Sequence, residues 1–224
     1  MILGIKFNLN SGLYNRDPQD TKLGQNILRY GIELIDGLGF ESFTFKKLAI
    51  KIGSTEASIY RYFDNKHSLL LFLTCWYWEW VHYLIQINLK NIEDPKRKLK
   101  IIIEQLVHAS SENTITEYIN ENLLHRIIIN EGSKAYHTHK VDQENDIGIF
   151  LGYKDVVKRI ADIIAEINPQ FPYKYSLASN LFEMTNNQIY FAEHLPRLTD
   201  IQDGEDIDAQ LISMLNYFVD KLLS

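Results

Sequence analysis

Apolar residues recur at steps of three and four along almost the whole 224-residue chain, and this spacing restricts its fold more than any other feature. Such a period places the apolar side chains on one face of an α-helix. Proline, which interrupts helices, occurs only five times. Few stretches alternate apolar and polar residues, as a half-buried strand would. The sequence therefore predicts an all-α fold.

Capping and turn residues divide this pattern into separate helices. Thr44 and Thr55 are suited to be N-caps, with Gly53 as the break between their two short helices. Asp94 followed by Pro95 is the pattern of a cap and a first helical residue. The expected helices span residues 20–38, 45–52, 56–62, 69–90, 95–110, 115–131, 147–167, 172–194 and 206–223. We expect an irregular arm at residues 1–19, and the polar stretch 131–146 receives no helix.

The composition is that of an ordinary globular protein, with 46% hydrophobic and 23% charged residues. The single cysteine, Cys75, follows an apolar run and is expected to be a buried thiol, because it has no partner for an intramolecular disulfide. The sequence has neither the pattern of a signal peptide nor an apolar run of membrane-spanning length. We therefore expect a cytoplasmic protein that does not enter the membrane.

The charge is distributed unevenly. The net charge of −6 argues against a protein that coats nucleic acid nonspecifically. Residues 44–66 nevertheless hold five basic side chains and only two acidic ones. The basic residues in this segment are Lys46, Lys47, Lys51, Arg61 and Lys66. A small basic module on an acidic body is expected when one end of a protein meets phosphate.

The segment at residues 44–70, TFKKLAIKIGSTEASIYRYFDNKHSLL, has the pattern of a helix-turn-helix. Two short helices with a glycine-containing break allow the second helix to project into a DNA major groove. Small residues on that helix, Thr55, Ala57 and Ser58, would permit a close approach to base edges. The apolar residues with the spacing to pack beneath it are Leu48, Ala49, Ile52, Ile59 and Phe63.

This segment resembles the DNA-binding domain of the TetR family of bacterial regulators. The resemblance covers residues 21–70. It rests on Leu48-Ala49, Gly53, Thr55, Ile59-Tyr60, Tyr62-Phe63, Lys66 and Leu69, which are in register with the family's signature. It implies a three-helix DNA-binding domain at residues 20–68, after the arm at 1–19. It also implies a helical effector-binding and dimerisation domain at 69–224.

The resemblance also implies roles for single residues. Thr44, Tyr60, Tyr62 and Lys66 would contact phosphates, and Lys46, Glu56, Ala57 and Ser58 would lie near base edges; Thr55 and Arg61 complete the expected DNA-binding set. Two readings of Glu56 stay open. Its carboxylate would accept a hydrogen bond from a cytosine amine, or it would be a first-turn acid favoured by the helix dipole.

The rest of the chain carries two weaker patterns. Apolar stripes on the last two helices are core residues by default, but the resemblance implies a homodimer interface there, with Leu181, Ile189, Leu211, Leu215, Phe218 and Leu222. Aromatic and histidine residues are candidates to line an effector pocket or, alternatively, to pack as core. They are Trp76, Trp80, Tyr83, His108, Tyr118, His125 and Phe182.

These patterns predict a DNA-binding regulator. We expect a repressor that binds a palindromic double-stranded operator as a homodimer and leaves it when a small-molecule effector binds. An activator or ligand-independent regulator of the same fold is one alternative, and a helical ligand carrier or enzyme is another. No nucleophile elbow, glycine-rich phosphate loop or metal-ligand spacing occurs, so no catalytic residue, cofactor or metal is expected.

Overall fold

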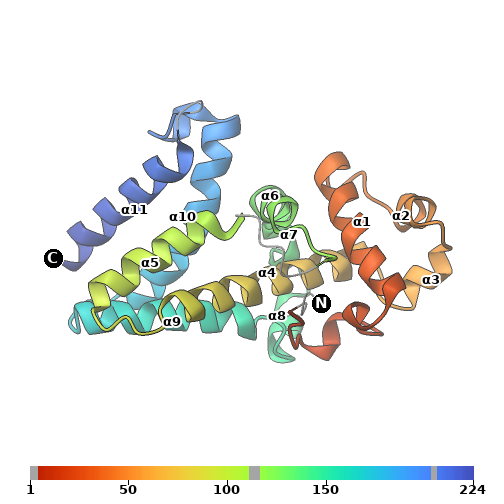
Figure 1. The fold of residues 1–224 in the computed structure, drawn as a ribbon, viewed down its shortest axis with the longest axis horizontal. Coiled ribbons are helices and arrows are strands. Elements are labelled where there is room, and N and C mark those ends of the chain that lie inside the picture. The colour runs from red at the N-terminus through yellow and green to blue at the C-terminus, as the bar shows by residue number, and fades with distance from the viewer. Residues whose placement is uncertain (1–4, 111–116, 203–205) are drawn as a thin grey trace. The chain divides into compact units, whose positions relative to one another are not determined.

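A computed structural model describes residues 5–110, 117–202 and 206–224, and over these ranges the chain contains helices and no strand (Figure 1). The all-α fold predicted from the apolar period is confirmed. The helices are α1 Lys22–Leu38, α2 Phe45–Ile52, α3 Glu56–Tyr60, α4 Lys66–Asn88, α5 Pro95–Val107, α6 Glu121–Glu131, α7 Ser133–Tyr136, α8 Val141–Asp146, α9 Leu151–Ile167, α10 Lys174–His194 and α11 Ile207–Leu223, with short 3-10 turns between some of them.

The chain folds into two compact units. The first comprises residues up to Glu79 together with Ser110–Leu151, and the second comprises Trp80–Ala109 with Gly152–Ser224. The functional division expected at residue 68 does not coincide with these units. The reason is that α6, which lies far beyond residue 68 in the sequence, packs against α1 in the first unit.

Side-chain caps fix where several helices begin. The Thr44 hydroxyl accepts a hydrogen bond from the Lys47 amide at 3.2 Å, and the Asp94 carboxylate accepts one from the Arg97 amide at 2.9 Å. Helix α4 begins at Lys66, three residues earlier than expected, because Asn65 caps it by accepting from the Ser68 amide at 3.0 Å.

The part of helix α4 between residues 69 and 78 is covered on all sides. Every residue from 69 to 78 is buried, including Trp76, Tyr77 and Trp78. A helix that is hydrophobic all round has no face for solvent and must be covered by neighbours. The helix up to Glu79 belongs to the first unit, and the helix from Trp80 onward belongs to the second. Both parts contribute buried aromatic side chains.

The segment predicted to be irregular, 131–146, contains the short helices α7 and α8. Ala135 on α7 is fully buried, whereas α8 has no buried residue, which explains why the sequence shows no clear apolar period there. The start expected for the preceding helix, residue 115, lies outside the described residues, and α6 itself begins at Glu121. No helix in the described ranges combines the length and the hydropathy that a bilayer crossing requires.

Candidate nucleic-acid interface

Capping interactions fix the turn between α2 and α3. Gly53 ends α2 with a φ of 65°, in the left-handed region where a side chain is strained, and its N–H donates to the Ile50 carbonyl at 3.2 Å. Thr55 then caps α3, because its hydroxyl accepts from the Ser58 amide at 3.3 Å. Helices α2 and α3 with this turn form a helix-turn-helix.

A small core supports the two helices. Leu48, Ile59 and Phe63 are fully buried, and Ala49 is nearly so. These four residues confirm the packing predicted from their spacing. Ile52, expected to join them, is only half-buried beside the turn.

The residues expected at base edges lie on accessible parts of α2 and α3. Lys46, Glu56 and Ala57 are exposed, and Ser58 is half-buried. The Ser58 hydroxyl lies 2.9 Å from the hydroxyl of Thr55, which is also exposed. Two hydroxyls and a methyl group thus occupy the first turn of α3, and short side chains of this kind allow a close approach to DNA.

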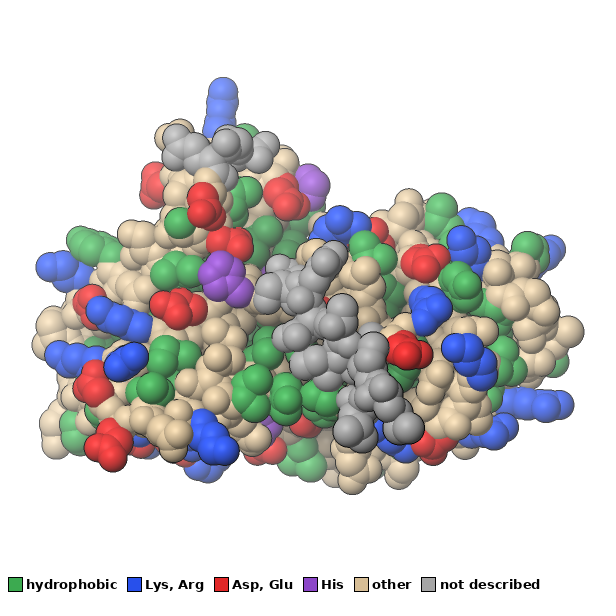
Figure 2. All heavy atoms as spheres, in the orientation of Figure 1, with side chains coloured by type: hydrophobic (Ala, Val, Ile, Leu, Met, Phe, Trp, Pro, Cys, Tyr) green, Lys and Arg blue, Asp and Glu red, His purple; other side chains and the backbone are tan. Residues whose placement is uncertain are grey.

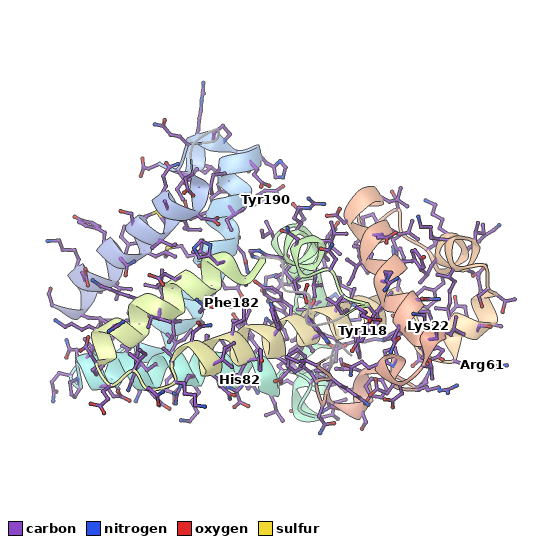
Figure 3. The ribbon with its side chains drawn as sticks, viewed as in Figure 1. Lys22, Arg61, His82, Tyr118, Phe182 and Tyr190 are labelled. Atoms are coloured by element: carbon purple, nitrogen blue, oxygen red, sulfur yellow. The ribbon has the colours of Figure 1, made fainter. Side chains whose placement is uncertain are left out.

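Three residues with polar tips lie at the rim of this surface. Tyr60 is 49% exposed, and its ring packs edge-on against Phe45 with 5.2 Å between ring centroids. Arg61 is exposed and points away from the domain (Figure 3). Thr44 is exposed, although its hydroxyl already caps α2. Figure 2 shows several lysine and arginine side chains over the part of the molecule that contains α1, α2 and α3.

Tyr62 does not lie where the resemblance implied. Its side chain is only 2% exposed, and its hydroxyl lies 2.7 Å from the Thr21 hydroxyl at the start of α1. The expected phosphate contact is therefore corrected: the ring is turned into the domain, where its hydroxyl joins the segment after α3 to the cap of α1.

Lys66 has partners within the chain. Its ammonium donates to the Phe40 carbonyl at 2.9 Å and the Glu41 carbonyl at 3.0 Å, and it lies 4.7 Å from the centroid of the Phe40 ring. An ammonium has three N–H donors, so one is left for a phosphate oxygen after these two bonds. The structure thus assigns Lys66 a role in holding the turn before α2, a role that was not predicted from the sequence.

Two groups of contacts around the helix-turn-helix were missed by the sequence analysis. The arm contacts the segment after α3 through Asn15, whose backbone amide donates to the Tyr62 carbonyl at 2.9 Å. On the other side, Arg126 of α6 forms a two-pronged ion pair with Asp36 of α1, at 2.9 and 2.6 Å. Both groups join segments distant in the sequence, so no local pattern reveals them.

A second contact joins α6 to the turn that precedes α2. The Glu131 carboxylate accepts from the Phe40 amide at 2.9 Å. Lys134 lies 2.7 Å from Glu131 and 3.2 Å from Glu41. Together with the Arg126–Asp36 pair, these contacts hold the DNA-binding helices to the rest of the first unit.

Three of the effector-pocket candidates lie in the first unit, and each is buried among protein groups. Trp76 packs edge-on against Phe7, and His125 stacks on Tyr77 with 5.5 Å between ring centroids. The Tyr118 hydroxyl donates to Gln19, and burial raises the pKa of Tyr118 to about 12. These contacts favour the core-packing alternative for the three residues.

The other four candidates lie in the second unit. Trp80 stacks on Tyr83 and donates to the Ala109 carbonyl at 3.3 Å, while the Phe182 ring contacts Tyr153. His108 is exposed and lies 3.1 Å from Asp208.

A groove of about 340 Å³ in the second unit contains none of the four candidates. Among its lining residues are Leu99, Val219 and Leu223, which are apolar, and Lys96 and Lys100, which are cationic.

The expected dimer residues divide into two groups. Leu181, Ile189, Leu211 and Leu215 are between 0% and 8% exposed, because α11 packs against α5 and α10 within the same unit. The interface role expected of these four is corrected, since their side chains are covered within one chain. Phe218 and Leu222 on α11 are 39% and 51% exposed and remain available to a partner.

Comparison with known proteins adds to this geometry. The family model of bacterial regulatory proteins of the tetR family matches residues 27–72, which include α2 and α3. No curated protein matches the chain significantly.

Solved structures share the fold over most of the chain. One is AibR in complex with isovaleryl coenzyme A and operator DNA, with 16% identity, a TM-score of 0.59, and coverage of 87% of this chain and 97% of that one. The fatty acid degradation regulator FadR from Bacillus halodurans has 15% identity, a TM-score of 0.61, and coverage of 87% and 92%. A tetR-family regulatory protein from Rhodococcus RHA1 has 16% identity, a TM-score of 0.59, and coverage of 91% and 96%.

Proposed function

The chain belongs, through its N-terminal DNA-binding domain, to the TetR family of bacterial regulatory proteins, and we propose that it is an effector-controlled repressor that binds a palindromic operator as a homodimer in the cytoplasm. The observation that carries this proposal is the capped helix-turn-helix, whose second helix begins with the exposed hydroxyl and methyl groups of Thr55 and Ala57.

In this proposal α3 enters the major groove. Lys46, Glu56, Ala57 and Ser58 approach base edges, while Tyr60 and Arg61 contact phosphates on either side. The accessibility of these residues supports the assignment. Helix α3 has only five residues and spans few base pairs, so a second copy is needed to recognise an operator of useful length.

We place the dimer contact on the exposed apolar part of α11, at Phe218 and Leu222. Large apolar side chains that remain exposed on a folded chain mark interaction surfaces when they lie together. The two residues are four apart and thus share one face of the helix. Paired α11 helices would hold the two copies of the chain together.

The effector is proposed to be a small molecule that contains an apolar acyl group. AibR is solved with isovaleryl coenzyme A, and FadR is described as a regulator of fatty acid degradation. Such a molecule releases DNA only if it binds better to the conformation that cannot reach both half-sites. The regulatory sign depends on where the operator lies relative to the promoter.

The proposal is tested by fluorescence anisotropy with the duplex from upstream of the chain's own coding sequence. A dimer that neutralises about eight phosphates should show a log–log slope of affinity against salt of roughly −7. Added isovaleryl coenzyme A is the effector probe and should raise the apparent Kd for that duplex. A slope near zero would exclude a phosphate-dominated DNA interface.

A further inference from the structure

The arm is fixed to the end of the recognition helix at Asn15. The backbone amide of Asn15 donates to the Tyr62 carbonyl. Its side-chain amide donates to the Asp64 carboxylate at 2.7 Å and to the Tyr60 carbonyl at 3.3 Å. Three hydrogen bonds from one residue to the turn after α3 set the position of the neighbouring residue, Arg16, relative to that helix.

Arg16 differs from the other cation of the arm. The Lys6 ammonium lies 2.9 Å from Asp17 and 2.5 Å from Asp20, so both carboxylates beside Arg16 already have a cation. The Arg16 side chain is exposed, and its guanidinium lies 5.6 Å from the centroid of the Tyr62 ring. Among the residues that the structure describes, no carboxylate forms an ion pair with it.

We propose that Arg16 contacts a DNA phosphate, so that the DNA-binding surface includes the arm as well as the helix-turn-helix. The inference rests on the proposed function, because it requires α3 to lie in the major groove. The backbone strands that border this groove pass beside the flanks of the inserted helix, and Arg16 is held at the end of α3. A guanidinium gives a phosphate two parallel N–H donors, and that of Arg16 lies within cation–π distance of the Tyr62 ring.

The experiment compares Arg16→Gln, Arg16→Lys and a control, Arg159→Gln, which removes another exposed arginine, from α9 of the second unit. Binding to a fluorescein-labelled duplex of mixed sequence is measured by anisotropy at several salt concentrations. Arg16→Gln should make the log–log slope less negative by about one unit for each protomer, since one phosphate contact is lost. Arg16→Lys retains the charge and should keep a slope near that of the wild type.

The outcomes separate this inference from the proposed function. If the wild type binds with a steep slope and Arg16→Gln matches Arg159→Gln in slope and affinity, the role of Arg16 is wrong and the proposed function stands. If the wild type does not bind DNA at all, both are wrong. Far-ultraviolet circular dichroism and thermal melting of the variants should match those of the wild type, because both arginines are exposed.

Discussion

Two tyrosines near the end of α3 lie in different environments, although one residue separates them. The Tyr60 side chain is about half exposed, and its ring packs on Phe45. The Tyr62 hydroxyl lies within the domain, in a hydrogen bond with Thr21. A hydroxyl that is satisfied within the protein contributes to stability, and one that faces solvent is free to contact a ligand.

Replacing each tyrosine by phenylalanine should therefore have opposite effects. Tyr62→Phe should lower the free energy of unfolding by about 1 kcal/mol, because the hydrogen bond between the Tyr62 and Thr21 hydroxyls is lost, while DNA affinity changes little. Tyr60→Phe should leave urea unfolding unchanged and weaken binding to operator and scrambled duplexes alike. A loss of DNA affinity in Tyr62→Phe without a loss of stability would show that its hydroxyl reaches DNA after all.

The Cys75 thiol should be unreactive in the folded protein. It is buried and its S–H donates to the Ile149 carbonyl at 3.5 Å; burial raises the pKa of this thiol well above its usual value. An ordinary thiol, with a pKa of about 8.5, reacts faster as the pH rises toward that value. The native protein should show no such rise with a disulfide reagent, and fast labelling at neutral pH would contradict the buried position.

The same shift gives Cys75 an effect on stability. The folded state holds the thiol proton more tightly than the unfolded state does. This stabilising contribution is thus present below the unfolded-state pKa of about 8.5 and is lost as the pH rises above it.

At the scale of whole elements, α6 is the helix that joins the DNA-binding helices to the rest of the first unit. Its Arg126 pairs with Asp36 near the end of α1, and its Glu131 accepts from the Phe40 amide in the next turn. Lys66 of α4 donates to carbonyls of that same turn. Lys134 of α7 also lies 3.2 Å from Glu41, so side chains from three different helices hold the turn before α2.

Changes at Glu131 should loosen this turn. Glu131→Ala removes the acceptor of the Phe40 amide and should lower the free energy of unfolding by about 1.5–3 kcal/mol, the range for hydrogen bonds to charged groups. Glu131→Gln retains an acceptor oxygen but loses the ion pair with Lys134, so it should cost less. Chemical denaturation of both variants measures the difference, and equal losses would mean that the Phe40 bond contributes nothing.

At the scale of the whole molecule, α11 presents two surfaces. Leu211 and Leu215 pack within the second unit, where they are fully buried. Phe218 and Leu222 lie outside that core. Substitutions on the two surfaces should therefore affect different equilibria, one of folding and one of association.

Leu215→Ala should lower the free energy of unfolding by about 2–5 kcal/mol, the usual cost of a cavity in a core. Phe218→Glu combined with Leu222→Glu should instead give folded monomers, since it places charge on the proposed contact surface. Circular dichroism and light scattering distinguish a lost fold from a lost dimer. A dimer that persists in the double variant would place the interface elsewhere.

Local information in the sequence was enough for the helix-turn-helix. The caps Thr44 and Thr55, the left-handed Gly53 and the apolar spacing of Leu48 and Ile59 act within a few residues of one another, so the printed sequence contains their whole cause. The same is true of the all-α fold, because a period of 3.6 residues is a property of each helix by itself.

Only the tertiary structure decided which side of each predicted face is covered. The residues around Tyr62 and around Leu215 do not indicate whether these side chains face a partner or the core of the chain. Packing within the chain buries both. The contacts of Asn15 with Tyr62 and of Glu131 with Phe40 join residues 47 and 91 positions apart in the sequence. Such pairs form because folding brings the segments together, and no periodicity or cap in either segment specifies its partner.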